Sequence, residues 1–221
     1  MIRRYGTAIL LLSAVAALLT AAAACNDEEE EPPTGTARPT GTPGSAATTG
    51  PAAGQYATPP AMAIDSQKSY VAVLETDKGV IRIKLLPDIA PQTVNSFVFL
   101  AREGYFDGVT FHRVLPGFVA QGGDPAGTGR GGPGYNLPDE FSDRPIDKGI
   151  VAMANTGQPN SGGSQFFITY TRQERLDGAY TVFGEVIEGM DVAEKLTPRD
   201  PDQNPNAPPG DRMIKVTIEE Q

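Results

Sequence analysis

The sequence predicts a mainly β domain, either a closed antiparallel barrel or a sandwich, with helices covering its ends. Three observations predict it: short segments in which apolar and polar residues alternate, only two segments with helical spacing, and long Gly- and Pro-rich stretches between them. The chain has 221 residues, of which 25 are Gly and 20 are Pro, and its hydrophobic content of 39% suffices for one core. We therefore expect one globular domain with additional segments.

Eight segments are expected to be strands. Residues 70–75 and 80–85 alternate and are joined by a Thr-Asp-Lys-Gly turn, so they predict a hairpin with one solvated face. The other six are short apolar or alternating runs: residues 110–114, 118–121, 149–154, 164–170, 180–186 and 213–219. Because side chains alternate along a strand, either Phe166 or Phe167 should face the core and the other a groove. Periodicity alone does not say which.

Two segments are expected to be helices. Residues 90–102 carry apolar side chains at helical spacing. Pro91 suits the first turn of this helix, and Gly104 suits the stop after it. A shorter helix is expected at residues 190–196. The first helix is amphipathic and should cover a sheet.

Residues 1–24 predict a secretory signal segment. Arg3 and Arg4 precede an uncharged run at residues 8–24, and small residues precede Cys25, the only cysteine in the chain. This arrangement resembles the lipobox of bacterial lipoproteins, in which the cysteine becomes the lipidated first residue. Two alternatives stay open: a retained anchor, because this run is near the lower length limit of a membrane span, and plain secretion.

Residues 25–66 are expected to form a disordered linker, and residues 67–221 the globular domain. The linker begins with an acidic run at residues 27–31 and continues with Pro, Thr, Gly and Ala. It has too few large apolar residues to offset the entropy lost on ordering. It is either a tether that holds the domain away from a membrane or a tail without a specific role.

Two segments predict a small binding pocket. Residues 111–124 read FHRVLPGFVAQGGD and place Arg113 among apolar side chains, while residues 160–167 read NSGGSQFF. A buried guanidinium is costly unless its donors find partners. Gln121 and Gln165 are further polar groups, next to glycine or aromatic residues. We expect an apolar pocket with a few fixed hydrogen-bond donors, suited to a proline within a peptide.

Several other functions are disfavoured by the sequence. The net charge of −9 and the lack of a basic run argue against a nucleic-acid partner. The single histidine, His112, does not make a metal site, and the Gly-rich residues 122–134 lack the Gly-Lys-Ser/Thr ending of a phosphate loop. Ser161 and Ser164 are outside any G-x-S-x-G frame. No cofactor or metal is expected.

The segments FHRVLPGFVAQGGD, MANTG, GSQFFI and LDGAYTVFGEV occur in the order and spacing of the cyclophilins. Residues 70–220 therefore resemble this family of peptidyl-prolyl cis–trans isomerases. The resemblance implies a closed eight-stranded antiparallel barrel capped by two helices, with the active groove on its outer face.

The resemblance also implies the roles of individual residues. The expected catalytic residues are Arg113, Phe118, Gln121 and Phe167. The expected substrate-binding residues are His112, Val119, Ala154, Asn155, Gln165, Leu176 and Tyr180. The chain departs from the family at a few positions: Val119 replaces a frequent Met, Tyr180 replaces the usual His, and Arg175 stands where many eukaryotic members carry a Trp associated with cyclosporin binding.

The leading hypothesis is a monomeric isomerase that is tethered to the membrane outside the cytoplasm of a bacterium. Its partners would be proline-containing segments of unfolded exported proteins, and the membrane through a lipid at Cys25. The alternatives are a module that binds proline peptides without turning them over, acting as a chaperone, and a structural lipoprotein of the envelope. The last leaves the polar groups of the pocket unexplained.

Overall fold

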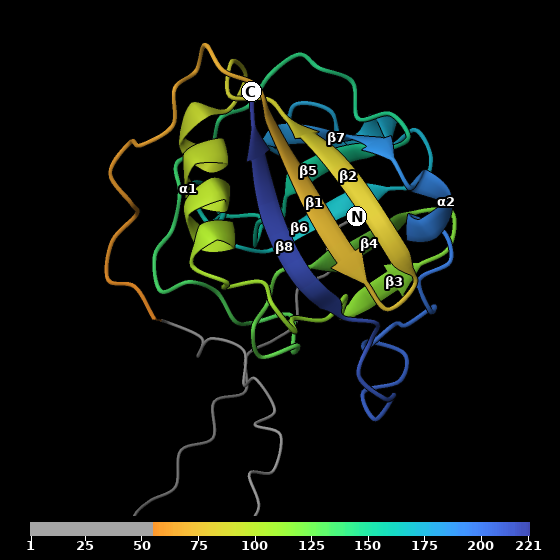
Figure 1. The fold of residues 1–221 in the computed structure, drawn as a ribbon. Helices are drawn as coiled ribbons and strands as arrows, with labels where there is room; N and C mark the ends of the chain where they lie inside the picture. The colour runs from red at the N-terminus through yellow and green to blue at the C-terminus, as the bar shows by residue number, and fades with distance from the viewer. Residues whose placement is uncertain (1–54) are drawn as a thin grey trace, which may run out of the picture. The chain divides into compact units, whose positions relative to one another are not determined.

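The computed structural model describes residues 55–221, so the signal segment, Cys25 and most of the expected linker lie outside the described residues. The described part contains one antiparallel sheet of eight strands in the order β3-β4-β6-β5-β7-β2-β1-β8, curled into a half-barrel (Figure 1). The strands are β1 (Tyr70–Thr76), β2 (Gly79–Leu85), β3 (Arg113–Leu115), β4 (Val119–Gly122), β5 (Ile150–Met153), β6 (Phe166–Thr169), β7 (Val182–Glu188) and β8 (Met213–Glu220). Every expected strand is present, with bounds shifted by a few residues.

The expectation of a closed barrel is not confirmed, because edge strands β3 and β8 do not pair with each other. The residues just before β3 instead bond to the start of β8. The Gly108 amide donates to the Met213 carbonyl at 2.7 Å, and the Phe111 amide donates to the Asp211 carbonyl at 2.9 Å. These bonds bring the two edges together through isolated contacts. Strand β3 has only three residues, and no continuous ladder crosses the seam.

The helices are α1 (Pro91–Arg102) and α2 (Met190–Ala193), with a 3-10 turn, η1 (Glu174–Leu176), between them in the sequence. Helix α1 packs beside β8, and α2 beside β2 (Figure 1). The first turn of α1 has no cap from its own N-cap residue. The distant Glu140 carboxylate accepts from the amides of Gln92 at 3.0 Å and Thr93 at 2.8 Å, which satisfies two free donors of that turn. Within residues 55–221, no helix combines the length and apolar composition needed to cross a membrane.

The core lies between α1 and the inner face of the sheet and is built around phenylalanines. Phe166 on β6 is fully buried, and it lies edge-on to Phe97 of α1 with ring centroids 5.5 Å apart. Three further rings surround it: Phe106, Phe111 and Phe183. In β2, Ile81, Ile83 and Leu85 point into this core, and the residues between them point outward. The predicted alternation of the hairpin is thus confirmed.

Residues 55–69 form a segment, here called the N-terminal strap, which runs along α1 before β1 begins (orange in Figure 1). The Asn95 side chain of α1 binds the strap through both the oxygen and the nitrogen of its amide group. Its Oδ1 accepts from the Ala63 amide at 2.8 Å, and its Nδ2 donates to the Ala61 carbonyl at 3.0 Å. Residues 55–66 belong to the linker expected from the sequence. They have no helix or strand, as expected, but they are bound to the domain, because a buried polar side chain on the helix supplies their hydrogen bonds.

Candidate active site

A cavity of about 100 Å³ lies on the outer face of the sheet, beside β4 and β6. Its lining residues all belong to the set expected from the sequence. They are Arg113, Phe118, Val119, Gln121, Ala154, Asn155, Phe167, Leu176 and Tyr180. Residues from five separate parts of the chain therefore converge on one small pocket, here called the proline pocket because the sequence predicts that it receives a proline.

The strand register places three of these residues in one row. Arg113 on β3 is opposite Gln121 on β4, and Gln121 is opposite Phe167 on β6. Directly paired residues of an antiparallel sheet lie on the same face, so the three side chains lie next to one another across three strands. Phe167 faces this pocket and Phe166 faces the core, which resolves the alternative that periodicity left open.

The walls of the proline pocket are mostly apolar. Phe167 is 5% exposed and belongs to a second apolar cluster under the pocket floor. The Tyr180 ring stands edge-on to the Phe167 ring, with centroids 5.3 Å apart. The Arg113 guanidinium lies 5.8 Å from the centroid of the Phe118 ring, within the range of a cation–π contact. Among residues 55–221 Arg113 has no carboxylate partner, so its donors remain available to a ligand.

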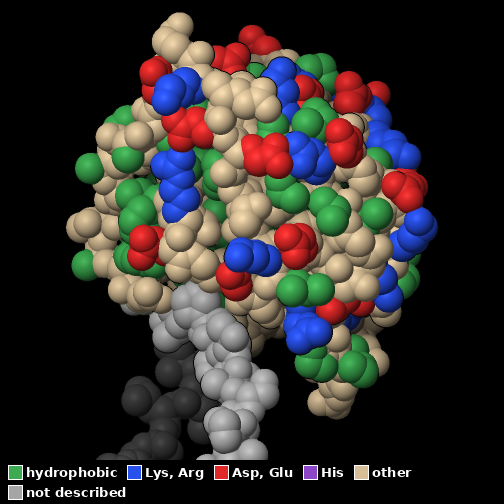
Figure 2. Space-filling view, viewed as in Figure 1, with side chains coloured by type: hydrophobic (Ala, Val, Ile, Leu, Met, Phe, Trp, Pro, Cys, Tyr) green, Lys and Arg blue, Asp and Glu red, His purple; other side chains and the backbone are tan. Residues whose placement is uncertain are grey.

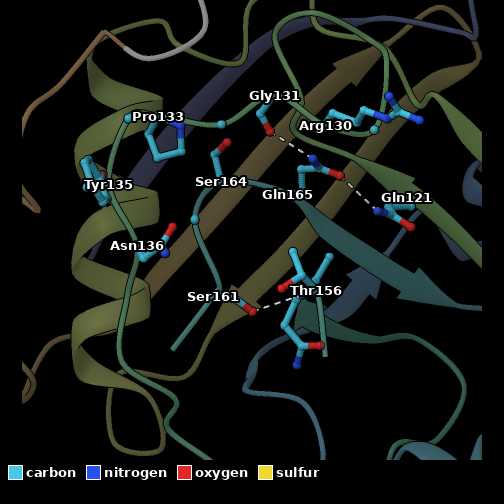
Figure 3. A pocket seen from close by; sticks show the side chains of 16 residues that line it. Gln121, Arg130, Gly131, Pro133, Tyr135, Asn136, Thr156, Ser161, Ser164 and Gln165 are labelled. Carbon is cyan, nitrogen blue, oxygen red and sulfur yellow. Dashed lines mark hydrogen bonds between the residues drawn. The ribbon is translucent and has the colours of Figure 1, made fainter. Parts of the chain in front are cut away.

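Two glutamines connect the pocket to a neighbouring loop. Gln121 Nε2 donates to Gln165 Oε1 at 3.0 Å, and Gln165 Nε2 donates to the Gly131 carbonyl at 2.9 Å (Figure 3). Asn155 is held by the donation of its Nδ2 to the Ala179 carbonyl at 3.1 Å. The polar groups at the edge of the pocket are therefore fixed before any ligand arrives.

A larger cavity of about 700 Å³ adjoins the proline pocket. It shares Gln121, Ala154 and Asn155 with it, and Gln165 lies in its wall (Figure 3). Its opposite wall is the glycine-rich loop at residues 129–134. From the sequence this loop stood out only by its lack of a phosphate-binding ending, and the larger cavity was not predicted.

Asp124 holds the glycine-rich loop from inside the domain. Its carboxylate accepts hydrogen bonds from the backbone amides of Ala126 at 2.8 Å, Thr128 at 2.8 Å and Gly129 at 2.6 Å. Burial alone would raise the pKa of Asp124, but the bonds from Ala126, Gly131 and Thr128 outweigh it and lower this pKa below its usual value. Asp124 was not among the residues expected to act at the site. An Asp followed by a Gly- and Thr-rich stretch is a local signal for such a turn.

His112 borders neither cavity, although it was expected at the groove edge. Its side chain is 2% exposed, and neither ring nitrogen has a hydrogen-bond partner among residues 55–221. Burial lowers the pKa of His112; the nearby Asp124 opposes this shift, and Arg199 and Arg113 add to it. The histidine directly before Arg113 is thus an inward-facing, neutral residue.

The buried His112 should make stability depend on pH. Because its pKa is lower in the folded than in the unfolded state, the unfolded state binds more protons as the pH falls below about 6.5. We expect the free energy of unfolding to decline from about pH 7 to pH 5, and His112→Phe to weaken this decline. Urea denaturation of both proteins across this range measures it, and equal slopes would contradict the prediction.

Known proteins are similar to this chain in sequence and in fold. Residues 71–218 match the family model described as cyclophilin type peptidyl-prolyl cis-trans isomerase/CLD. A peptidyl-prolyl cis-trans isomerase of Synechococcus elongatus is 47% identical over 66% of this chain and 94% of its own. Peptidyl-prolyl cis-trans isomerase B of Bacillus subtilis is 48% identical over 55% of this chain and 85% of its own.

Solved structures agree with these matches. A cyclophilin type peptidyl-prolyl cis-trans isomerase of Cryptosporidium parvum superimposes with a TM-score of 0.63 and 32% identity, over 69% of this chain and 99% of its own. Another crystal structure of that protein was determined in the presence of the dipeptide Ala-Pro. The described domain catalyses cis–trans isomerisation of peptidyl-prolyl bonds, and the chain belongs to the family of cyclophilin-type peptidyl-prolyl cis–trans isomerases.

Proposed function

We propose that isomerisation occurs in the proline pocket and that Arg113 assists the rotation. The proline ring would be held by Phe118, Val119, Phe167 and Leu176. The observation that carries this proposal is the row of Arg113, Gln121 and Phe167 on adjacent strands beside an apolar cavity. The relative that was crystallised in the presence of Ala-Pro supports a proline peptide as the ligand.

The reaction sets two requirements on such a pocket. The X-Pro bond rotates across a barrier of roughly 20 kcal/mol, and without a catalyst this takes on the order of tens to hundreds of seconds. No covalent bond breaks during the rotation. The enzyme must hold the ring while the preceding carbonyl turns, and it must bind the twisted amide more tightly than either planar form.

Arg113 meets the second requirement. When the amide twists, its nitrogen regains a lone pair and becomes a hydrogen-bond acceptor. A guanidinium donor beside that nitrogen stabilises the twisted form and not the planar one. Because a guanidinium stays protonated, we expect activity to be flat from about pH 6 to pH 9. An optimum confined to pH values near 7 would count against this role.

Gln121 and Asn155 would bind the substrate backbone where it leaves the proline pocket. Both line the proline pocket and the larger cavity, so a bound peptide would extend from one into the other. Gln165 would keep Gln121 in position through their hydrogen bond.

The assay for this site follows isomerisation of a proline tetrapeptide in parallel with binding of the same peptide. An active enzyme accelerates the exchange above the uncatalysed rate and shows saturation. A module that only binds proline peptides would give saturable binding at the uncatalysed rate. That result would contradict turnover at this site.

We also propose that the protein is a monomer exported to the cell envelope, lipidated at Cys25, and that it assists folding of exported proteins. The basic and apolar character of residues 1–24 and the position of the single cysteine support export and lipidation. Mass spectrometry of the mature N-terminus should show a chain that begins with a lipid-modified Cys25. An intact N-terminus would favour a retained anchor, and an unmodified cleaved chain would favour plain secretion.

A further inference from the structure

The two cavities differ in charge from the rest of the protein. The chain as a whole carries a net charge of −9. The residues that line the two cavities include no aspartate or glutamate, and their only charged side chains are Arg113 and Arg130. An otherwise acidic protein therefore presents a cationic groove.

The positive charge of Arg130 is not neutralised within the described domain. Elsewhere, acidic and basic side chains are interspersed, as on the face of β1, β2 and β8 (Figure 2), where Arg82 pairs with Glu219. Among residues 55–221, neither Arg130 nor Arg113 pairs with a carboxylate. The Arg130 side chain is exposed and lines the larger cavity together with Gln121 (Figure 3).

The backbone that carries Arg130 is held in place. Its amide donates to Asp124 at 3.1 Å, and the next carbonyl, of Gly131, accepts from Gln165 at 2.9 Å. Asp124 itself has no exposed surface, and its oxygens are occupied by loop donors, so it does not supply a carboxylate to the groove. The guanidinium therefore extends from a fixed point beside the substrate path.

We propose that Arg130 makes this enzyme prefer substrates that carry an acidic side chain close to the proline. This rests on the proposed function, in which the proline occupies the proline pocket. A peptide bound there passes Gln121 and Asn155 into the larger cavity, which brings a nearby carboxylate within reach of Arg130. A guanidinium can form two parallel, charge-assisted hydrogen bonds with the carboxylate of a substrate glutamate. A substrate glutamine has the same size but a neutral amide, so it binds the guanidinium more weakly.

The test uses pairs of proline peptides in which one member has Glu and the other has Gln at the same position. In one pair this position precedes the proline, and in the other pair it follows the proline. The readout is the Glu/Gln ratio of kcat/KM. In the wild type we expect a ratio of about two to five for one placement, as for an exposed ion pair, declining toward one at about 1 M salt. Arg130→Gln should bring this ratio close to one, and Arg130→Lys should retain part of it.

Lys215 supplies a matched control. It is an exposed cation on β8 without a carboxylate partner among residues 55–221, and it lines neither cavity. Lys215→Gln removes the same charge, so it should leave the wild-type ratio in place. An equal loss in this variant would assign the preference to net charge and overturn the role of Arg130.

The remaining outcomes separate the two proposals. If the wild type isomerises all the peptides with a ratio near one, or if Arg130→Gln keeps the wild-type ratio, selection by Arg130 is wrong while the proposed function stands. If no peptide is isomerised above the uncatalysed rate, the proposed function itself fails. Melting temperatures of the variants establish that each is folded.

Discussion

Replacing Arg113 with alanine should reduce kcat/KM for a proline tetrapeptide by about 10²- to 10³-fold, the usual effect of removing one donor that acts only in the transition state. The loss should fall mainly on kcat, because in the proposed mechanism other residues hold the ring and the guanidinium bonds only the twisted amide. Arg113→Lys keeps the charge but loses the planar set of donors, so it should recover only part of the activity.

Stability measurements separate this effect from misfolding. Arg113 is half-buried and makes no ion pair among residues 55–221, so Arg113→Ala should change the free energy of unfolding by less than about 1 kcal/mol. A variant that is fully folded and as active as the wild type would remove Arg113 from the mechanism. Another donor near the proline nitrogen, such as Gln121, would then have to be tested.

Replacing Phe166 with alanine should lower the free energy of unfolding by about 3–5 kcal/mol. Its ring is fully buried and packs edge-on against two other rings. The centroid distances are 5.5 Å to Phe97 and 6.0 Å to Phe106. Truncation leaves a cavity at the centre of a group of rings that pack against both α1 and the sheet, which limits how far the neighbours collapse. Urea denaturation monitored by circular dichroism gives the change.

The adjacent Phe167 is the matched comparison, because it has the same side chain on the opposite face of β6. Phe167→Ala enlarges the proline pocket, so we expect it to raise KM and lower kcat in the folded protein. Phe166→Ala should instead leave the activity per folded molecule near that of the wild type. If Phe166→Ala lost less than about 1 kcal/mol, the central place of this ring in the core would be contradicted.

The strands and the first helix could be predicted because their signals are local. Alternation in β1 and β2 and the apolar spacing of α1 follow directly from which face is buried. The seam between β3 and β8 could not be predicted, because it depends on backbone bonds between residues about a hundred positions apart, such as Gly108 to Met213. Family resemblance suggested closure at this seam, which the ladder does not show.

The site shows the same division between local and distant signals. The four motifs that carry the family resemblance contain every residue that lines the proline pocket. His112 was expected at the groove edge but lies on the core side, as alternation requires: Arg113 faces the pocket, and its neighbours His112 and Val114 are both buried. The position of Arg130 in the groove could not be predicted, because it depends on how Asp124 and Gln165 hold the glycine-rich loop.

The N-terminal strap has a mechanical consequence. The Tyr56 amide donates to the Pro133 carbonyl at 2.8 Å, and Asn95 binds the strap further along. Tension on the chain before residue 55 would thus load these bonds first and reach β1 only after they had broken. The family match begins at residue 71, so a protein shortened to that boundary would lack the bonds that keep tension from β1. It would also leave the buried amide of Asn95 without its backbone partners.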